Sequence, residues 1–186
     1  MELRFQAGGP ESWSADAVIV FLSEDEKLEK AYPELLDAAP WMSIAPGMRD
    51  FHGKKGEMGL LYGPPAHPLS RAVVVGLGKL DALTYAETLE ELRKGAGAAA
   101  LRCRELGVDT LALPVSGLAR FNADVERTIE EIVCAAMLGL WRNKAFKSKE
   151  PEDADPRWLA LLFCDANVPD FPRLAARRGE THAEAV

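Results

Sequence analysis

The histidines are the first side chains to consider, because imidazole is a common metal ligand and a common general acid or base near neutral pH. The chain has three, His52, His67 and His182, and they lie far apart in the sequence. None belongs to an H-E-x-x-H motif, and no Asp or Glu lies one helical turn from any of them. The ligand spacings that zinc requires therefore predict no metal site in this chain.

A second group of titratable residues surrounds a predicted turn. Asp50, His52 and Glu57 lie there beside Lys54 and Lys55. Carboxylates and lysines in an exposed turn more often form solvated ion pairs than general acid-base machinery. The serines also lack the G-x-S-x-G context of a nucleophile elbow. Catalysis by this chain alone is not expected.

The third chemical candidate is a glycine turn after a run of valines. Val73–Val75 is typical of a strand covered on both faces, and Gly76 and Gly78 let the backbone turn directly after it. Thr84 and Glu87 then have the spacing of a capping box that begins a helix. A dinucleotide site would also need a third glycine and an acidic residue on a later strand, and neither is evident. We interpret the glycines as a strand-to-helix connection, with a ligand loop as the alternative.

The composition is that of an ordinary globular domain. Hydrophobic residues make up 48% and charged residues 27% of the 186 residues. Asp and Glu outnumber Lys and Arg by 29 to 22, so overall charge does not favour nucleic-acid binding. No apolar run has the length of a membrane span, the start does not resemble a secretory signal, and a cytoplasmic protein is expected. Cys103, Cys134 and Cys164 form no C-x-x-C pair and are expected to be buried, reduced thiols.

The elements that must position these residues alternate between strand and helix. Strands are predicted at 3–5, 14–22, 73–75, 110–113 and 158–163, and long helices at 84–106 and 124–142. Segment 51–62 is predicted to add two strands joined by a turn, which gives an antiparallel edge. The acidic run at 24–26 is interpreted as the solvated start of a helix. The predicted fold class is α/β: a three-layer α/β/α domain with a mixed, mostly parallel sheet.

Two smaller features complete this description. The middle of the first long helix, Gly95–Ala100, is so small that the helix can approach the sheet closely. Near the end of the chain, Thr181 is predicted to cap a helix that begins at Ala183 and has room for less than two turns. Because so short a helix is not stable by itself, we expect it to continue toward a further domain.

Five segments together resemble one protein family in order and spacing. They are Ala15–Leu22, Asp50–Glu57, Leu61–Pro64, Val73–Lys79 and Leu138–Lys147. They resemble the amino-terminal domain of the leucyl (cytosol) aminopeptidase family, over nearly the whole chain. The resemblance implies that residues 1–170 are this accessory domain and that residues 171–186 are a truncated linker or helix toward a missing catalytic domain. The family's Asn-Thr-Asp-Ala-Glu-Gly-Arg segment has no match here, so no catalytic residue is carried over.

The resemblance also implies properties of the intact enzyme. Such an enzyme releases amino-terminal residues from peptides, with two divalent metal ions (Mn or Zn) in its catalytic domain, and assembles as a homo-hexamer in the cytoplasm. The present chain would bind its own catalytic domain and would be a monomer or weak dimer without it.

A likeness of fold gives the alternative function. The family's amino-terminal domain is similar to macro domains, which bind ADP-ribose. Asp16 begins a segment similar to the macro-domain strand whose aspartate contacts adenine, and Leu113–Gly117 is similar to the phosphate loop. Asp16, Ser116 and Gly117 are therefore the candidate positions for binding ADP-ribose or a related nucleotide. The asparagine-rich turn and the further glycines of those loops are absent, which removes N–H groups that would hold a diphosphate.

Overall fold

The computed structural model describes residues 2–81, 83–121, 124–140, 158–162 and 170–186. Its strands are β1 (Glu2–Gln6), β2 (Ala17–Leu22), β3 (Met58–Tyr62), β4 (Arg71–Gly76), β5 (Thr110–Pro114) and β6 (Trp158–Leu162). Its α-helices are α1 (Leu28–Ala31), α2 (Pro33–Ala38), α3 (Trp41–Ile44), α4 (Pro46–Arg49), α5 (Tyr85–Glu105), α6 (Val125–Leu140) and α7 (Asp170–Glu184). Two 3-10 helices, η1 (Pro10–Ser12) and η2 (Ser116–Phe121), complete the described elements.

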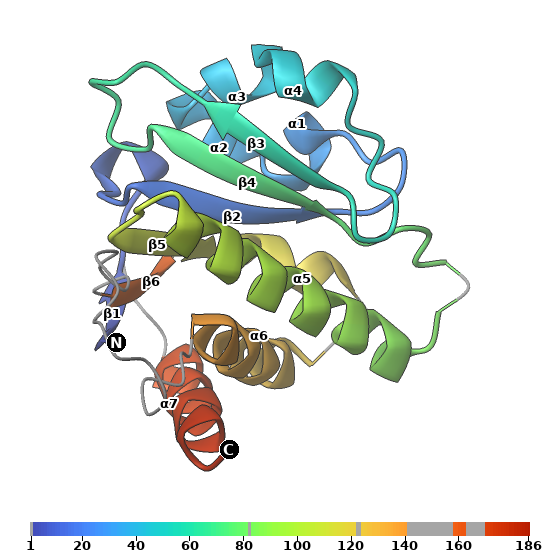
Figure 1. Cartoon of the computed structure of the whole chain (residues 1–186), viewed down its shortest axis with the longest axis vertical. Coiled ribbons are helices and arrows are strands. Elements are labelled where there is room, and N and C mark those ends of the chain that lie inside the picture. The colour runs from blue at the N-terminus through green and yellow to red at the C-terminus, as the bar shows by residue number, and fades with distance from the viewer. Residues whose placement is uncertain (1, 82, 122–123, 141–157, 163–169) are drawn as a thin grey trace, which may run out of the picture.

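The described strands form one six-stranded sheet in the order β1-β6-β5-β2-β4-β3. β3 is antiparallel to β4, and the other neighbouring pairs are parallel. Figure 1 shows α1–α4 on one face of the sheet and α5 and α6 on the other. The predicted three-layer α/β/α fold with a mixed, mostly parallel sheet is confirmed.

The valine strand shows how the sheet supports a core on each face. Val73 and Val75 pack in the cluster that contains α5 and α6, whereas Val74 packs in the cluster that contains α1–α4. All three side chains are buried. An unbroken apolar run suits such a strand, because both of its faces are covered.

Helix α5 begins and packs as predicted. The Thr84 hydroxyl accepts a hydrogen bond from the Glu87 N–H (3.3 Å), and the Glu87 carboxylate accepts one from the Thr84 N–H (2.8 Å), so the capping box is present. A Cβ at Gly95 would lie 2.7 Å from a methyl group of Val75. The small residues therefore do allow the helix to approach the sheet.

The prediction of two strands within 51–62 is wrong. Only Met58–Tyr62 is a strand, and its partner is β4. The preceding loop instead binds the glycine turn: the Gly56 N–H donates to the Gly76 carbonyl (3.0 Å) and the Gly78 N–H to the Gly53 carbonyl (2.8 Å). A Cβ at Gly76 would overlap this loop's backbone, so close approach explains that glycine.

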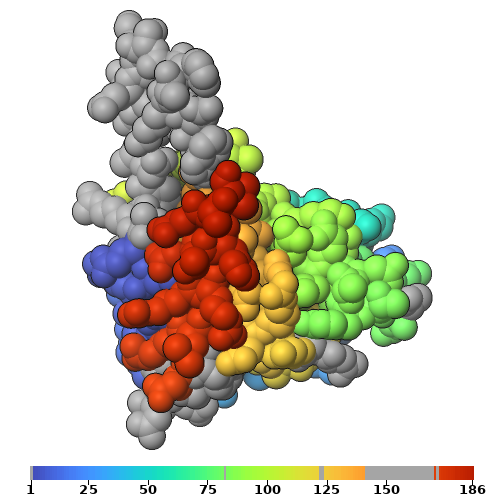
Figure 2. All heavy atoms as spheres, turned by 90° about the horizontal axis from the view of Figure 1, so that it is seen from below, coloured from blue at the N-terminus to red at the C-terminus, as the bar shows by residue number. Residues whose placement is uncertain are grey.

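The prediction that Thr181 caps a helix beginning at Ala183 is also wrong. Thr181 lies inside α7, and its hydroxyl donates to the carbonyl of Arg177, one turn earlier (3.0 Å). Pro172 is tolerated in the first turn, where the N–H that it lacks would have no helical partner. The helix packs along α6, as Figure 2 shows in red and orange, and buries Ala175 and Ala176 completely. The assignment of 171–186 to a connection between domains stays a prediction.

Candidate functional site

The structure places Asp16 and the pair Ser116–Gly117 at opposite ends of the sheet. Asp16 precedes β2, and its Oδ2 accepts hydrogen bonds from the Thr110 hydroxyl (2.8 Å) and from the N–H groups of Asp109 and Thr110 (3.2 and 3.0 Å). Ser116 and Gly117 follow the carboxyl end of β5. Since β2 has six residues, the two places are roughly 20 Å apart. Asp16 thus joins the starts of β2 and β5 and does not meet the other two candidates.

The gap between β2 and β5 is closed by two side chains. The strands pair at Ala17–Leu111 and Val18–Ala112, near their amino ends. Farther along β2, the Phe21 N–H donates to the Tyr32 hydroxyl (3.1 Å), and the Phe21 carbonyl accepts a hydrogen bond from the Arg120 guanidinium. Tyr32 and Arg120 therefore satisfy the backbone groups that a neighbouring strand would otherwise satisfy.

The same two side chains occupy the space in front of the candidate phosphate loop. A Cβ at Gly117 would overlap the ring of Tyr32, which is only 4% exposed. The Gly117 carbonyl accepts a hydrogen bond from Arg120. Nucleotide binding at Asp16, Ser116 and Gly117 stays a prediction. The pocket that Ser116 and Gly117 line has a volume of only about 190 Å³, and Asp16 lies at the other end of the sheet, so the packing does not favour it.

Arg120 is the centre of a network that the sequence analysis missed. Its Nε donates to Glu26 (3.1 Å), whose other oxygen accepts from the N–H (2.9 Å) and the hydroxyl (3.1 Å) of Ser23. The guanidinium carbon also lies 4.6 Å from the ring centre of Tyr32 and 4.2 Å from that of Phe121. Glu26 is thus a partner of Arg120 and not part of a solvated helix start, since α1 begins only at Leu28. The sequence did hold a signal for this ion pair. An acidic run follows β2, and Arg120 follows β5, the strand beside β2 in the sheet.

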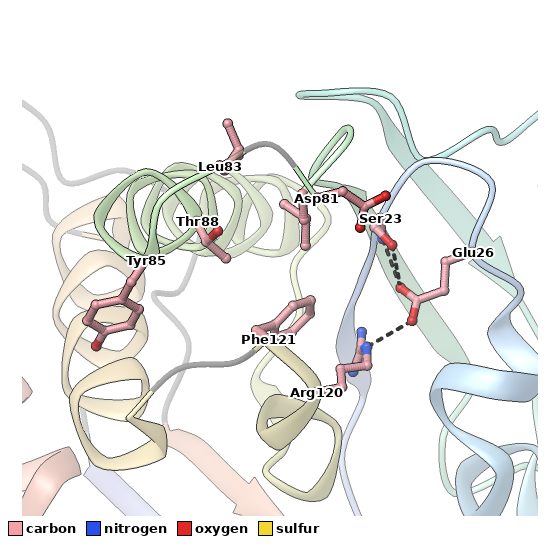
Figure 3. Close-up of a pocket in the computed structure, with 9 residues that line it drawn as sticks. Ser23, Glu26, Asp81, Leu83, Tyr85, Thr88, Arg120 and Phe121 are labelled. Atoms are coloured by element: carbon pink, nitrogen blue, oxygen red, sulfur yellow. Dashed lines mark hydrogen bonds and ion pairs between the residues drawn. The ribbon is translucent and has the colours of Figure 1, made fainter.

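A pocket of about 400 Å³ lies at the carboxyl ends of β2, β4 and β5, beside this network (Figure 3). Its polar lining includes Ser23 and Glu26 after β2, Asp81 after β4, and Thr88 and Tyr85 on α5. The chain leaves β2 toward α1–α4 on one face and leaves β5 toward α6 on the other. Ligands of α/β sheets usually bind at such a change of direction.

Two of the three histidines, His67 and His182, have ring contacts with neighbouring groups. His67 accepts at Nδ1 from the Leu69 N–H (3.0 Å), with its Nε2 3.0 Å from the Ala38 carbonyl, and His182 lies 3.1 Å from Glu130. Within the described ranges, no three His, Cys, Asp or Glu side chains are grouped so that they could hold a metal ion. These residues do not fit a two-metal centre.

The predicted ion pairs around Asp50 and His52 take another form. The Glu57 carboxylate accepts from the N–H groups of His52 (3.1 Å) and Lys54 (2.9 Å), so it shapes the loop. Lys55 pairs with Glu91 of α5 (2.9 Å). This group of residues therefore attaches the 51–57 loop to the domain.

Two of the three cysteines can be compared with the prediction. Cys103 and Cys134 are free and buried, as expected. Burial raises the pKa of Cys103 to about 12 and also raises the pKa of Cys134. Such thiols are weak nucleophiles. Cys164 lies outside the described residues.

Comparison with known proteins decides the family. Residues 17–150 match the sequence profile of the cytosol aminopeptidase family, N-terminal domain. The chain therefore belongs to this family. A probable cytosol aminopeptidase of Nitratidesulfovibrio vulgaris is 46% identical over 188 residues, which cover 98% of this chain and 36% of that protein. The chain spans about a third of the length of the curated relatives it matches.

Solved structures confirm the fold. A mutant of tomato leucine aminopeptidase matches with a TM-score of 0.69 at 16% identity, over 97% of this chain and 35% of that one. The Trypanosoma brucei macrodomain in complex with ADP-ribose matches with a TM-score of 0.64 at 10% identity, over 95% of this chain and 68% of that one. The macro-domain-like fold of this N-terminal domain is thus confirmed, while likeness at such low identity carries no function.

Among the described helices, none is both long enough and apolar enough to cross a membrane.

Proposed function

We propose that this chain is the accessory, non-catalytic domain of a cytoplasmic metalloaminopeptidase. The observation that carries the proposal is the match to the family's N-terminal domain, in a chain about a third as long as its relatives. In the intact enzyme, a separate catalytic domain would hold two divalent metal ions, Mn or Zn, and release amino-terminal residues from peptides. The present domain would pack beside it and help to shape access to its active site.

Helix α7 supports this arrangement. Arg178 and His182 both contact Glu130 of α6, at 3.0 and 3.1 Å, and the Glu130 side chain is almost fully buried. These contacts fix the direction of α7 relative to the domain. A helix held in this way would give residues 171–186 a rigid path toward the catalytic domain.

The oligomeric state follows from the same proposal. If catalytic domains make the main contacts of a hexamer, this chain alone is a monomer or a weak dimer. Light scattering at micromolar concentration measures this directly. A stable hexamer of the 186-residue chain would contradict the proposal, because the assembly contacts would then lie in this domain.

Binding of ADP-ribose or a related nucleotide is the less supported function. Tyr32 and Arg120 fill the gap beside Gly117, and Asp16 is engaged with Thr110 at the other end of the sheet.

An enzyme assay tests the proposal. The purified chain should hydrolyse no L-leucine p-nitroanilide above a protein-free blank, with either manganese or zinc added. Activity that co-purifies with the chain through every column would contradict a non-catalytic role.

A further inference from the structure

The pocket beside Arg120 contains two polar groups that the rest of the described chain does not use. Thr88 is 95% buried, with 5% of its surface exposed, and lines the pocket from α5. Its hydroxyl has no hydrogen-bond partner within the described ranges. Asp81 lines the pocket from the loop after β4 and has no described Lys or Arg within ion-pair distance. A hydroxyl and a carboxylate that face a pocket can both accept hydrogen bonds from a ligand that donates them.

The positive charge in the pocket is already engaged. Arg120 donates to Glu26 and to the carbonyls of Phe21 and Gly117, and it lies 3.4 Å from the Tyr32 hydroxyl. Arg120 and Glu26 therefore balance each other, and the charge of Asp81 leaves the pocket negative. A phosphate or carboxylate placed here would meet two carboxylates and one engaged guanidinium.

Tyr85 lines the same pocket from α5. Burial raises the pKa of its hydroxyl, and the negative charge of the nearby Asp124 raises the pKa further.

The remaining wall of the pocket is apolar. Leu80, Leu83 and Phe121 contribute to it. A volume of about 400 Å³ is near the lower limit for ligand pockets, so the ligand would be small.

We propose that this pocket binds a small organic ammonium ion. The ammonium group would contact the Asp81 carboxylate, and an aliphatic body would lie against Leu83 and Phe121. This proposal goes beyond the accessory role proposed above, because it gives the domain a ligand of its own.

Titration of the 186-residue chain with a matched pair of probes tests the proposal. The pair is 3-methylbutan-1-amine, which is cationic at neutral pH, and 3-methylbutan-1-ol, which has the same body without the charge. We expect saturable shifts of the Asp81, Thr88 and Phe121 amide NMR signals with the amine, and a dissociation constant on the order of 1 mM. The alcohol should bind at least about tenfold more weakly. Equal binding of the two probes, or no saturable binding of the amine, would overturn the proposal.

Two variants locate the site. Asp81→Asn removes the charge from an exposed loop and should weaken amine binding about fivefold. Asp37→Asn, on the exposed surface of α2, is the matched control and should leave binding unchanged. Unchanged binding to Asp81→Asn would refute the assigned contact. Saturable micromolar binding of ADP-ribose at the same signals would show instead that the pocket prefers an anion.

Discussion

The guanidinium of Arg120 donates a hydrogen bond to the backbone carbonyl of Phe21, across the gap where β5 no longer pairs with β2. This single side chain also holds the carboxylate of Glu26 and the turn at Gly117. It therefore connects the ends of two parallel strands at the place where many α/β proteins keep a ligand crevice open.

Replacement of Arg120 by alanine should destabilise the fold. The change would leave the Phe21 carbonyl and the half-buried Glu26 without their partner, and we expect a loss of about 2–3 kcal/mol in the free energy of unfolding. Denaturant unfolding measures it. Arg102→Ala is the control, because Arg102 forms an exposed pair with Glu105 and should cost less than about 0.5 kcal/mol. Equal losses in the two variants would show that Arg120 has no special structural role.

The two threonines at helix positions should respond differently to alanine. Thr84→Ala removes the capping hydroxyl of α5 and should cost about 1 kcal/mol. Thr181→Ala changes an exposed residue inside α7 and should be neutral within about 0.5 kcal/mol. Thermal or denaturant unfolding compares them. A larger loss for Thr181→Ala would mean that Thr181 does cap a helix.

Close packing of α5 and α6 depends on Gly139. A Cβ there would overlap the carbonyl of Gly97, so Gly139→Ala should cost more than about 2 kcal/mol by forcing the helices apart. Gly107→Ala is the comparison, because a Cβ at that position meets open space and only its φ of +64° is unfavourable, at about 1 kcal/mol. If Gly139→Ala were the milder change, this helix contact would be looser than described.

Glu91 should make stability depend on acid pH. Burial by itself would raise its pKa, but hydrogen bonds from Lys55 and Lys94 outweigh that effect, and the pKa lies below the ordinary 4.5. A depressed pKa in the folded state gives stability that is present above 4.5 and lost as the pH falls below it. The free energy of unfolding should therefore fall more steeply between about pH 5 and about pH 3 in the wild type than in Glu91→Gln. If the free energy of unfolding fell equally with pH in the wild type and in Glu91→Gln, the lowered pKa of Glu91 would be contradicted.

Local signals in the sequence predicted most of the fold. The valine run at 73–75 and the pair Thr84–Glu87 need only their own neighbours to specify a strand and a capped helix, and both were predicted correctly. The 51–57 loop was mistaken for a strand because its backbone partners are Gly76 and Gly78, which are distant in the sequence. The start of α7 was missed because Thr181, a residue type that often caps helices, lies inside the helix instead of before it.

The candidate site was harder to predict from the sequence, because its residues also depend on partners that are distant in the sequence. Asp16 and Gly117 were selected by likeness to a distant fold, and the structure puts them at opposite ends of the sheet. Arg120 and Tyr32 matter through contacts with Phe21, which no short motif encodes. Side chains that join separate strands become evident only when the strand order is known.

The most direct test of the account is a domain exchange. This chain would replace the matching N-terminal segment of the Nitratidesulfovibrio vulgaris relative, to which it is 46% identical. The chimera should hydrolyse L-leucine p-nitroanilide with manganese at a rate on the order of that of the parent enzyme, while the chain alone should show no turnover. A folded chimera without hydrolytic activity, measured beside an active parent, would contradict the claim that this chain is the accessory domain of such an aminopeptidase.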